Sequence, residues 1–404
     1  MQSVDQITPA DLDELLKDSA VENVRLEFKS QDVSKDEALK KLTSFANTFG
    51  GYMIIGAEAN ADGRLVGLPG VDPVSGFKQR MVAWGYGGAS PPLQLFVSDP
   101  ISSPQDATRV CYVIYVPESE ETPHFINDRK GVYIRTDEFS QRFEPQLATY
   151  EEIQHLANRR AITVARRESI INRAAGRFIT HATKSQVTPP NLVLSVCPKF
   201  PSKALMPHAE IPKLLNSCRV AWRSTGFPKW SEPITQHEST IILEASGLAN
   251  SLLEINIWGL LFYAYDILDK TPRWPGQTEE ISGIHLYSLV GHILVSLEHA
   301  KSMYDRMGFD GSLLVRTKLD RIRGISLLSS DGHNWLMENP ASPLDDSVEF
   351  DMVTTSTILK TQRDELAADI ARILMFALNR ADVAANDDAI KKLLAAGYKF
   401  NYWQ

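Results

Sequence analysis

Basic side chains that could bind phosphate groups are concentrated between residues 158 and 184. This segment reads NRRAITVARRESIINRAAGRFITHATK and contains a single acid, Glu168. Its basic residues are Arg159, Arg160, Arg166, Arg167, Arg173, Arg177 and Lys184. The whole chain has a formal net charge of −8, so affinity for a polyanion would have to come from such a local concentration. We expect the first four arginines to contact nucleic acid; the alternative is a solvated helix face that pairs with an acidic partner subunit.

The composition is that of a globular chain without membrane spans or disulfides. Apolar residues make up 43% and charged residues 23% of the 404 residues, which is ordinary for a globular protein. No run approaches the roughly 18–20 apolar residues of a membrane span, and the acidic N-terminus lacks the apolar core of a secretion signal. The three cysteines, Cys111, Cys197 and Cys218, are odd in number and far apart. We therefore expect a cytoplasmic protein with no membrane partner.

Three histidines, His285, His292 and His299, recur every seven residues and so fall on one stripe of a helix. Seven residues of helix rise about 10.5 Å, which is too far for two of these side chains to share a metal ion. We interpret them as packing or interface residues. The sequence contains no GxxxxGK[ST] loop, GxSxG elbow or HExxH motif, so no machinery for ATP hydrolysis is visible.

Caps and apolar periodicity predict an α+β fold for the first 160 residues. Thr8 and Pro9 begin a helix over 8–20, and Ser34 caps a second helix over 34–51 that ends at a Gly-Gly pair. Apolar or alternating runs predict strands within 21–30, 52–58, 64–68, 90–100, 109–119 and at the start of 130–143. Two of these runs, 52–58 and 64–68, flank the turn sequence NADG and read as a hairpin. Another helix begins near Thr149.

The second half of the chain also predicts an α+β fold. A basic helix and linker cover 161–190, where KSQVTPPN, with two prolines, marks the linker. We expect strands or sheet at 191–200, 239–247, 256–267, 311–328 and 348–357, and helices at 287–309 and 364–381. The predicted domains are thus 1–160, followed by the connecting segment, and 191–404.

The first domain resembles the Schlafen AlbA-type domain family over about residues 10–160. The resemblance depends on three segments in order, VRLEFKS, LTSFANTFGGYMIIGAEANADGRLVGL and GVYIRTDEFSQRF. It implies a nucleic-acid-binding, regulatory domain. Some relatives are metal-dependent ribonucleases that act on tRNA and rRNA, with three acids in their active site.

The resemblance also implies a candidate metal site. Glu22 and Glu27 match the first two acids of the family and would bind Mg²⁺ or Mn²⁺ through oxygen, and the metal would polarise the phosphate and activate water. Their odd spacing would place them on opposite faces of a regular strand, so both can reach one metal ion only if Glu22 lies on the loop or helix end before that strand. The family's third acid falls on Ala59, so Glu58 or Asp62 would have to replace it. A degenerate site that binds without cutting fits equally well, as do solvated carboxylates paired with neighbouring basic residues.

Three further residues could contact nucleic acid. Lys29 follows Glu27 on the same strand face and could touch a phosphate. Tyr133 and Arg135 share a strand face and could supply stacking and a charge-assisted phosphate contact. The alternative for Arg135 is a structural role at the edge of the core.

These observations predict a nucleic-acid-binding protein with a regulatory or defence-related role, which forms a homo-oligomer whose paired first domains make a groove. The alternative is an endoribonuclease that depends on Mg²⁺ or Mn²⁺, cleaves tRNA or other structured RNA, and uses Glu22, Glu27 and either Glu58 or Asp62. A third reading is a protein-binding or assembly module without nucleic acid.

Overall fold

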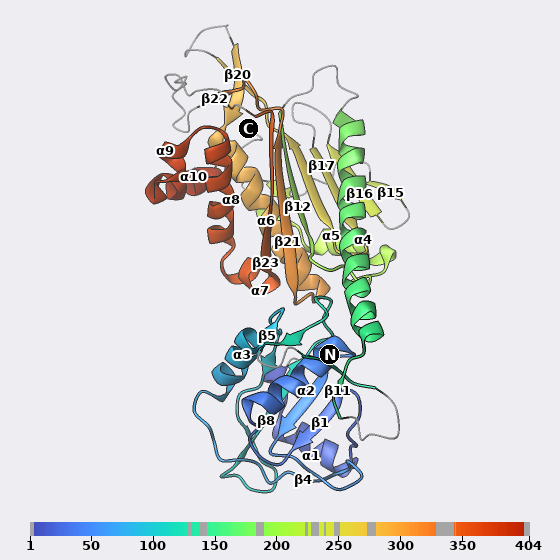
Figure 1. Cartoon of the computed structure of the whole chain (residues 1–404). Coiled ribbons are helices and arrows are strands. Elements are labelled where there is room, and N and C mark those ends of the chain that lie inside the picture. Colours follow the sequence, from blue (N-terminus) through green and yellow to red (C-terminus); the bar gives the residue numbers. More distant parts are fainter. Residues whose placement is uncertain are drawn as a thin grey trace. The chain divides into compact units, whose positions relative to one another are not determined.

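The computed structural model describes residues 4–127, 131–136, 144–182, 190–222, 225–227, 234–237, 240–245, 251–272, 280–328, 343 and 345–399. The chain divides into two compact units, Met1–Thr163 (unit 1) and Val164–Gln404 (unit 2), close to the predicted boundary at 160. Each unit combines helices with sheets, so the predicted α+β class is confirmed (Figure 1). Within the described ranges, no helix has the length and apolarity to cross a membrane. The predicted linker at 184–191 lies mostly outside the described residues.

Unit 1 contains short strands and four helices among its described residues. In chain order its elements are η1 (Val4–Gln6), α1 (Pro9–Lys17), β1 (Leu26–Lys29), α2 (Lys35–Asn47), β2 (Gly51–Ile55), β3 (Glu58–Ala59), β4 (Leu65–Gly67), α3 (Phe77–Gly88), β5 (Ala89–Ser90), β6 (Phe96–Val97), β7 (Ile101–Ser102), β8 (Val110–Val116), β9 (Phe125–Ile126), β10 (Gly131–Ile134), β11 (Gln146–Leu147) and α4 (Tyr150–Ala182), which continues into unit 2. The caps predicted for α1 and α2 are present, since Thr8 and Ser34 accept bonds from the helix amides.

The central sheet of unit 1 has the order β1-β2-β8-β6, with β7 also on β8. β1 and β2 are parallel and are joined through α2; the other pairs are antiparallel. On one face Phe45 of α2 packs with Met53 and Ile114. On the other face Leu12 of α1 packs with Phe28. The alternation along β1 therefore sends Phe28 toward α1 and Glu27 toward α2.

A second sheet in unit 1 has the order β11-β10-β9-β5. The buried amide of Asn47, at the end of α2, holds this sheet to the helix. Its nitrogen donates to the carbonyls of Tyr133 (2.9 Å) and His124 (3.1 Å), and its oxygen accepts the His124 amide (2.8 Å). Asn47 thus fixes the position of β10 beside α2.

One expectation for unit 1 is corrected, and one helix, α3, was not predicted. The hairpin around NADG is formed by β3 and β4, whereas β2 belongs to the central sheet. The turn itself is as predicted, with a Gly63 amide to Asn60 carbonyl bond of 3.0 Å. Helix α3 is not indicated by the sequence pattern, because its three glycines disfavour helix. Two of them allow close packing, since a Cβ on Gly85 or Gly88 would lie 2.5 or 2.4 Å from a leucine side chain.

Unit 2 is built on a seven-stranded antiparallel sheet in the order β15-β16-β17-β18-β12-β21-β23. Its elements are β12 (Asn191–Pro198), η2 (His208–Glu210), α5 (Ile211–Ser217), β13 (Val220–Trp222), β14 (Thr225–Phe227), β15 (Ile234–His237), β16 (Thr240–Ala245), β17 (Ser251–Asn256), β18 (Leu261–Asp266), β19 (Asp269–Pro272), β20 (Glu280–His285), α6 (Leu286–Met307), β21 (Ser312–Asp320), β22 (Ser326–Leu328), β23 (Ser347–Thr355), α7 (Ser356–Thr361), α8 (Arg363–Ala377), α9 (Ala381–Ala384) and α10 (Asp387–Lys399). The strands predicted within 311–328 are present as β21 and β22, and β22 pairs with β20.

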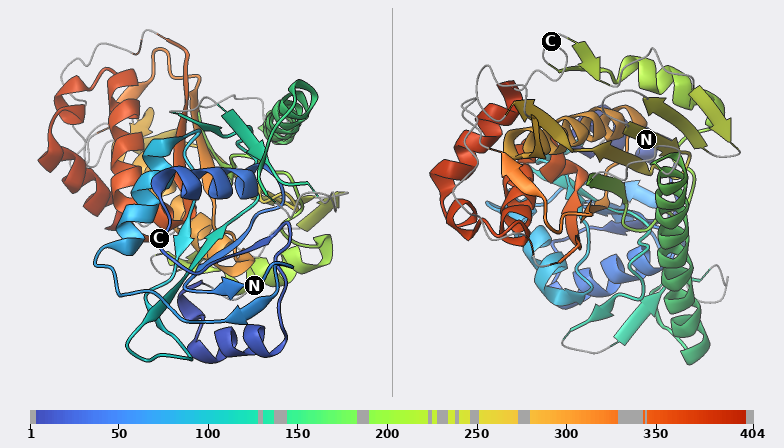
Figure 2. Two further views of the ribbon diagram at one scale, coloured as in Figure 1. Left: turned by 60° about the horizontal axis from the view of Figure 1, so that its bottom comes forward. Right: turned by 90° about the horizontal axis from the view of Figure 1, so that it is seen from above.

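Helices cover both faces of this sheet (Figure 2). Helices α6, α8 and α10 share one core with β12, β18 and β21. Part of α4 packs on the opposite face through Ile170, Ile171, Ala174 and Phe178. The packing interpretation of the histidines on α6 is confirmed: His299 Nδ1 lies 2.8 Å from the Tyr263 hydroxyl, and His292 stacks on Tyr265.

Candidate functional site

The carboxylate of Glu27 is enclosed by three cations in unit 1. Its Oε2 lies 2.5 Å from Arg135 Nη2, and its Oε1 lies 2.7 Å from Lys41 Nζ and 3.2 Å from Lys29 Nζ. Glu27 is only 4% exposed. Burial raises the pKa of this carboxyl, but the charges and hydrogen bonds of Arg135 and Lys41 together lower it by more, so the net shift of the pKa is downward. Glu27 is therefore ionised, and both of its oxygens are occupied by cations from its own chain.

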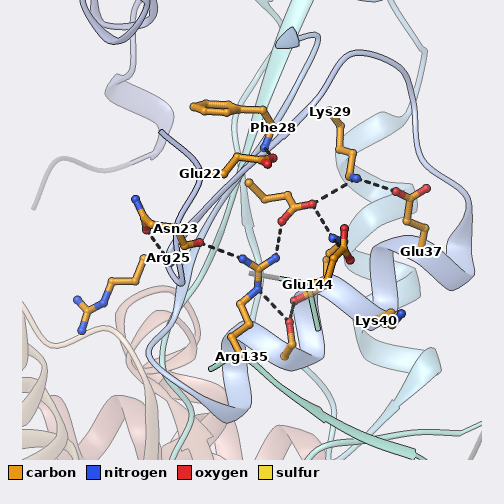
Figure 3. Close-up of polar contacts among 12 residues, drawn as sticks. Glu22, Asn23, Arg25, Phe28, Lys29, Glu37, Lys40, Arg135 and Glu144 are labelled. Atoms are coloured by element: carbon orange, nitrogen blue, oxygen red, sulfur yellow. Dashed lines mark hydrogen bonds and ion pairs between the residues drawn. The ribbon is translucent and has the colours of Figure 1, made fainter. Parts of the chain in front are cut away.

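Arg135 is the largest fully buried side chain of the described residues, at 1% exposure. Besides Glu27, its guanidinium donates to the Asn23 carbonyl (3.1 Å) and the Ser44 hydroxyl (3.3 Å) (Figure 3). Its central carbon lies 4.0 Å from the Phe45 ring centroid. Arg135 thus joins β10, α2 and the loop before β1. A buried guanidinium cannot contact nucleic acid, so that expectation is corrected, and the structural alternative describes this residue.

Two exposed glutamates complete the ion pairs of the lysines. Lys29 Nζ lies 3.0 Å from Glu37 Oε1, and Lys41 Nζ lies 2.7 Å from Glu144 Oε2. The side chains of Glu37 and Glu144 are 43% and 58% exposed. Each ammonium group therefore bridges the buried Glu27 and an exposed carboxylate. Burial lowers the pKa of Lys29, but Glu27 and Glu37 raise it by more, so the net shift is upward.

Sequence reasoning did not single out Lys41. A signal was present, because Lys41 occupies the same helix stripe as the core residues Ala38 and Phe45, where an apolar side chain would be expected. A lysine on the buried stripe of an amphipathic helix requires a buried anion. That anion is Glu27.

Glu22 lies before β1, which is the position expected if it were to share a metal ion with Glu27. Its backbone amide donates to the Gly63 carbonyl (2.8 Å), and its Oε1 accepts the Phe28 amide (2.8 Å). Burial is the main cause that raises the pKa of Glu22, and the charge of Glu27 adds to it. Glu22 and Glu27 are thus close enough to interact electrostatically, although among the described residues no ion pair to Glu22 matches the three that hold Glu27.

The remaining candidate acids lie on the β3–β4 hairpin. Glu58 and Asp62 are both exposed, and the Asp62 amide donates to Asn60 Oδ1 at 3.0 Å. Ala59, at the family's third acid position, packs against the core on the α1 face. Among the residues that the structure describes, no group of three or more acidic, histidine or cysteine side chains could hold a metal ion. The donor set therefore does not fit a three-acid metal site.

Most of the basic run is engaged within its own unit. In unit 1, Arg159 donates to Glu118 Oε1 (2.9 Å) and to the Ser119 carbonyl (2.6 Å). In unit 2, Arg166 donates to the Pro201 and Ser202 carbonyls (2.9 and 2.8 Å). The guanidinium groups of these two arginines are therefore held by backbone carbonyls of the fold and, for Arg159, by Glu118.

The next arginine in the run behaves in the same way. Arg167 donates to the Lys199 carbonyl and to Glu168, both at 2.8 Å. Glu168 in turn pairs with Arg316 of β21 at 2.7 Å. A purely solvated face is thus excluded for Arg159, Arg166 and Arg167, and their contacts with nucleic acid stay predictions. Arg160 is exposed, so its contact with nucleic acid stays a prediction.

Residues 22–144 match the family model described as Schlafen, AlbA_2. This part of unit 1 is a Schlafen AlbA_2 domain. The match extends from Glu22 to Glu144 and so includes Glu27, its three cations and both exposed glutamates. Unit 2 lies outside the matched residues. Residues 137–143, which form most of the motif TDEFSQRF, lie outside the described residues. No curated protein matches the chain.

Proposed function

We propose that the Schlafen AlbA_2 domain binds nucleic acid and that Lys29 contacts its phosphates. The observation that carries this proposal is the partly exposed ammonium group of Lys29, which is held by the buried Glu27 and the exposed Glu37. Ion pairs with exposed partners contribute only about 0–1 kcal/mol. A phosphate can therefore replace Glu37 at little cost, while Glu27, which the buried Lys41 also holds, keeps Lys29 in place.

The same geometry favours binding over cutting. Cleavage of a phosphodiester at a metal site needs carboxylates that are free to coordinate the cation. Glu27 already contacts three cations, and Glu22 accepts a backbone amide. We therefore propose that Glu27 serves to position Lys29 and Lys41 and does not coordinate a catalytic metal ion.

Binding can be measured by the fluorescence anisotropy of labelled RNA and DNA with the full chain. We expect affinity to fall steeply between about 50 and about 200 mM salt, because phosphate contacts release counterions. Lys29→Gln should weaken binding to every sequence by a similar factor and reduce the salt dependence. Lys17→Gln is the control, since Lys17 is an exposed lysine paired with Asp13 on α1. Absence of binding at low salt, or binding that salt does not change, would refute the proposal.

The nuclease alternative stays a prediction, and the proximity of Glu22 and Glu27 is the observation that supports it. It predicts cleavage of tRNA or another structured RNA that requires Mn²⁺ or Mg²⁺ and is lost in Glu27→Ala. Metal-stimulated cleavage that survives this substitution would exclude Glu27 from the reaction.

A homo-oligomer and a protein-binding role also stay predictions. Analytical ultracentrifugation of the chain with and without RNA tests both. A change in subunit number on adding RNA supports a nucleic-acid groove built from paired domains.

A further inference from the structure

Two aromatic rings in unit 1, one exposed and one half-buried, each lie beside a cation. The guanidinium carbon of Arg25 is 5.7 Å from the centroid of the Phe49 ring, and Lys40 Nζ is 5.5 Å from the centroid of the Tyr133 ring. Phe49 is 44% exposed, and Tyr133 is half-buried. We call these the two ring–cation pairs. An exposed phenylalanine beside an arginine is not needed for the core, so its position calls for another explanation.

Both pairs are positioned by Arg135. Its backbone amide donates to the hydroxyl of Thr48, the residue before Phe49, at 2.9 Å. Its guanidinium holds the carbonyl of Asn23, two residues before Arg25. Tyr133 precedes Arg135 by two residues on the segment that begins with β10. The rings therefore stand on a rigid support that also holds Glu27 and its lysines.

The backbone of Arg25 is fixed while its side chain faces solvent. Its amide donates to Asn23 Oδ1 (2.8 Å), and its carbonyl accepts the Tyr52 amide (2.7 Å). In Figure 3 the charged ends of Arg25 and Lys40 lie outside the dashed network, on opposite sides of Arg135. One ring–cation pair is thus found on either side of the cluster.

The Tyr133 ring has an apolar neighbour. Tyr133 lies directly opposite Leu147 in the antiparallel pair of β10 and β11, so both side chains are on the same sheet face. Leu147 is exposed. A planar ligand that stacks on Tyr133 would also cover this leucine.

We infer that the two ring–cation pairs are stacking sites for the unpaired bases of single-stranded nucleic acid. This inference rests on the proposed function and names the substrate class of the same site. Aromatic rings contribute about 1–3 kcal/mol per stacked base, and nearby cations neutralise the adjoining phosphates. In a duplex the bases stack on each other and are not available to Phe49 or Tyr133. The domain should therefore bind single strands more tightly than duplexes of equal length.

The test compares a labelled single-stranded oligonucleotide with its duplex on the full chain. Phe49→Ala and Tyr133→Ala should each weaken single-strand binding by roughly 5- to 150-fold, while duplex binding changes by less than about twofold. Tyr133→Phe keeps the ring and should bind like the unchanged chain. Tyr86→Ala is the matched control, because Tyr86 is an exposed aromatic on α3.

A direct readout comes from Phe49→Trp and Tyr133→Trp. Stacking should quench or shift the new tryptophan emission when the single strand is added, and the duplex should leave it unchanged. Equal affinity of the unchanged chain for both strand forms, or alanine variants that bind the single strand normally, would overturn the inference and leave the proposed function standing. Failure to bind either form would instead refute the proposed function. Phe49→Leu and Tyr133→Leu keep an apolar side chain without the ring, and their unfolding transitions check that a lost affinity does not reflect misfolding.

Discussion

Arg135 donates to the carboxylate of Glu27 across a separation of 108 residues, and both side chains are buried. The pair joins the parallel β1–α2–β2 segment to the second sheet of unit 1. Breaking a buried ion pair by removing one partner costs about 3–5 kcal/mol, because the other charge stays buried without compensation. The Arg135–Glu27 ion pair therefore stabilises the packing of these elements and also belongs to the candidate site.

This relationship predicts a large effect of Arg135→Met on stability. Two lysines remain at Glu27, but Oε2 and the Asn23 carbonyl lose their donors. We expect unit 1 to lose about 3 kcal/mol of unfolding free energy, measured by urea denaturation of the full chain. Arg25→Met, at an exposed arginine of the same region, should change stability by less than about 0.5 kcal/mol. A stable Arg135→Met chain that only loses nucleic-acid binding would contradict the structural role.

The exposed glutamates predict a gain of affinity when they are neutralised. Glu37→Gln removes the carboxylate that competes with phosphate for Lys29, and Glu144→Gln removes an exposed carboxylate from the same cluster. An exposed ion pair is worth up to about 1 kcal/mol, so each substitution should tighten binding up to about fivefold. Anisotropy titrations at one fixed salt concentration measure this change.

A control separates this local effect from net charge. Glu14→Gln removes the same charge from an exposed position on α1 and should change affinity much less. If Glu14→Gln raised the affinity as much as Glu37→Gln and Glu144→Gln, the change in net charge alone would account for the gain.

The buried histidine of unit 2 predicts a dependence of stability on pH. Burial lowers the pKa of His299 to about 3, against about 6.5 in the unfolded chain. Between these values the unfolded state takes up a proton that the folded state does not, so stability decreases as pH falls. From pH 7.5 to pH 5 the loss is about 2 kcal/mol.

Urea unfolding of the chain and of His299→Gln at both pH values isolates this contribution. The destabilisation caused by the substitution should be smaller at pH 5, because the glutamine cannot be protonated. His155→Gln, at an exposed position on α4, should show no such change. A His299→Gln effect that is equal at both pH values would contradict the assignment.

Local signals in the sequence predicted local structure well. The caps at Thr8 and Ser34, the glycine stop after α2 and the NADG turn each depend on residues within a few positions of one another. Gly50 has a positive φ of 67°, and a side chain there would meet the Glu118 amide at 2.6 Å. Such features depend on local hydrogen bonds and backbone sterics, and the residue types at neighbouring positions are enough to predict them.

The site could be predicted only in part, because its partners are distant in the chain. Glu27 and Lys29 were identified, but their roles depend on Lys41 and Arg135, which tertiary packing brings to them. The contacts of the basic run are hidden from sequence reasoning for the same reason. Its composition does not reveal the carbonyls at 199, 201 and 202 that bind Arg166 and Arg167, because they are more than 30 residues away.

Arg177, the last arginine on α4, also binds a group that is distant in the chain, and this contact predicts an effect on stability. Its Nε lies 2.7 Å from Oε2 of Glu254 on β17, and Glu254 is fully buried. Arg177→Met leaves that carboxylate uncompensated and should destabilise unit 2 by about 3 kcal/mol, seen as a lower calorimetric transition of the full chain. Arg173→Met, at an exposed arginine one turn earlier, should cost less than about 0.5 kcal/mol. Both variants should bind nucleic acid like the unchanged chain, since the contacts we propose lie in unit 1. If Arg177→Met had normal stability but bound nucleic acid more weakly, the basic run at 158–184 would be supported as part of the nucleic-acid-binding surface.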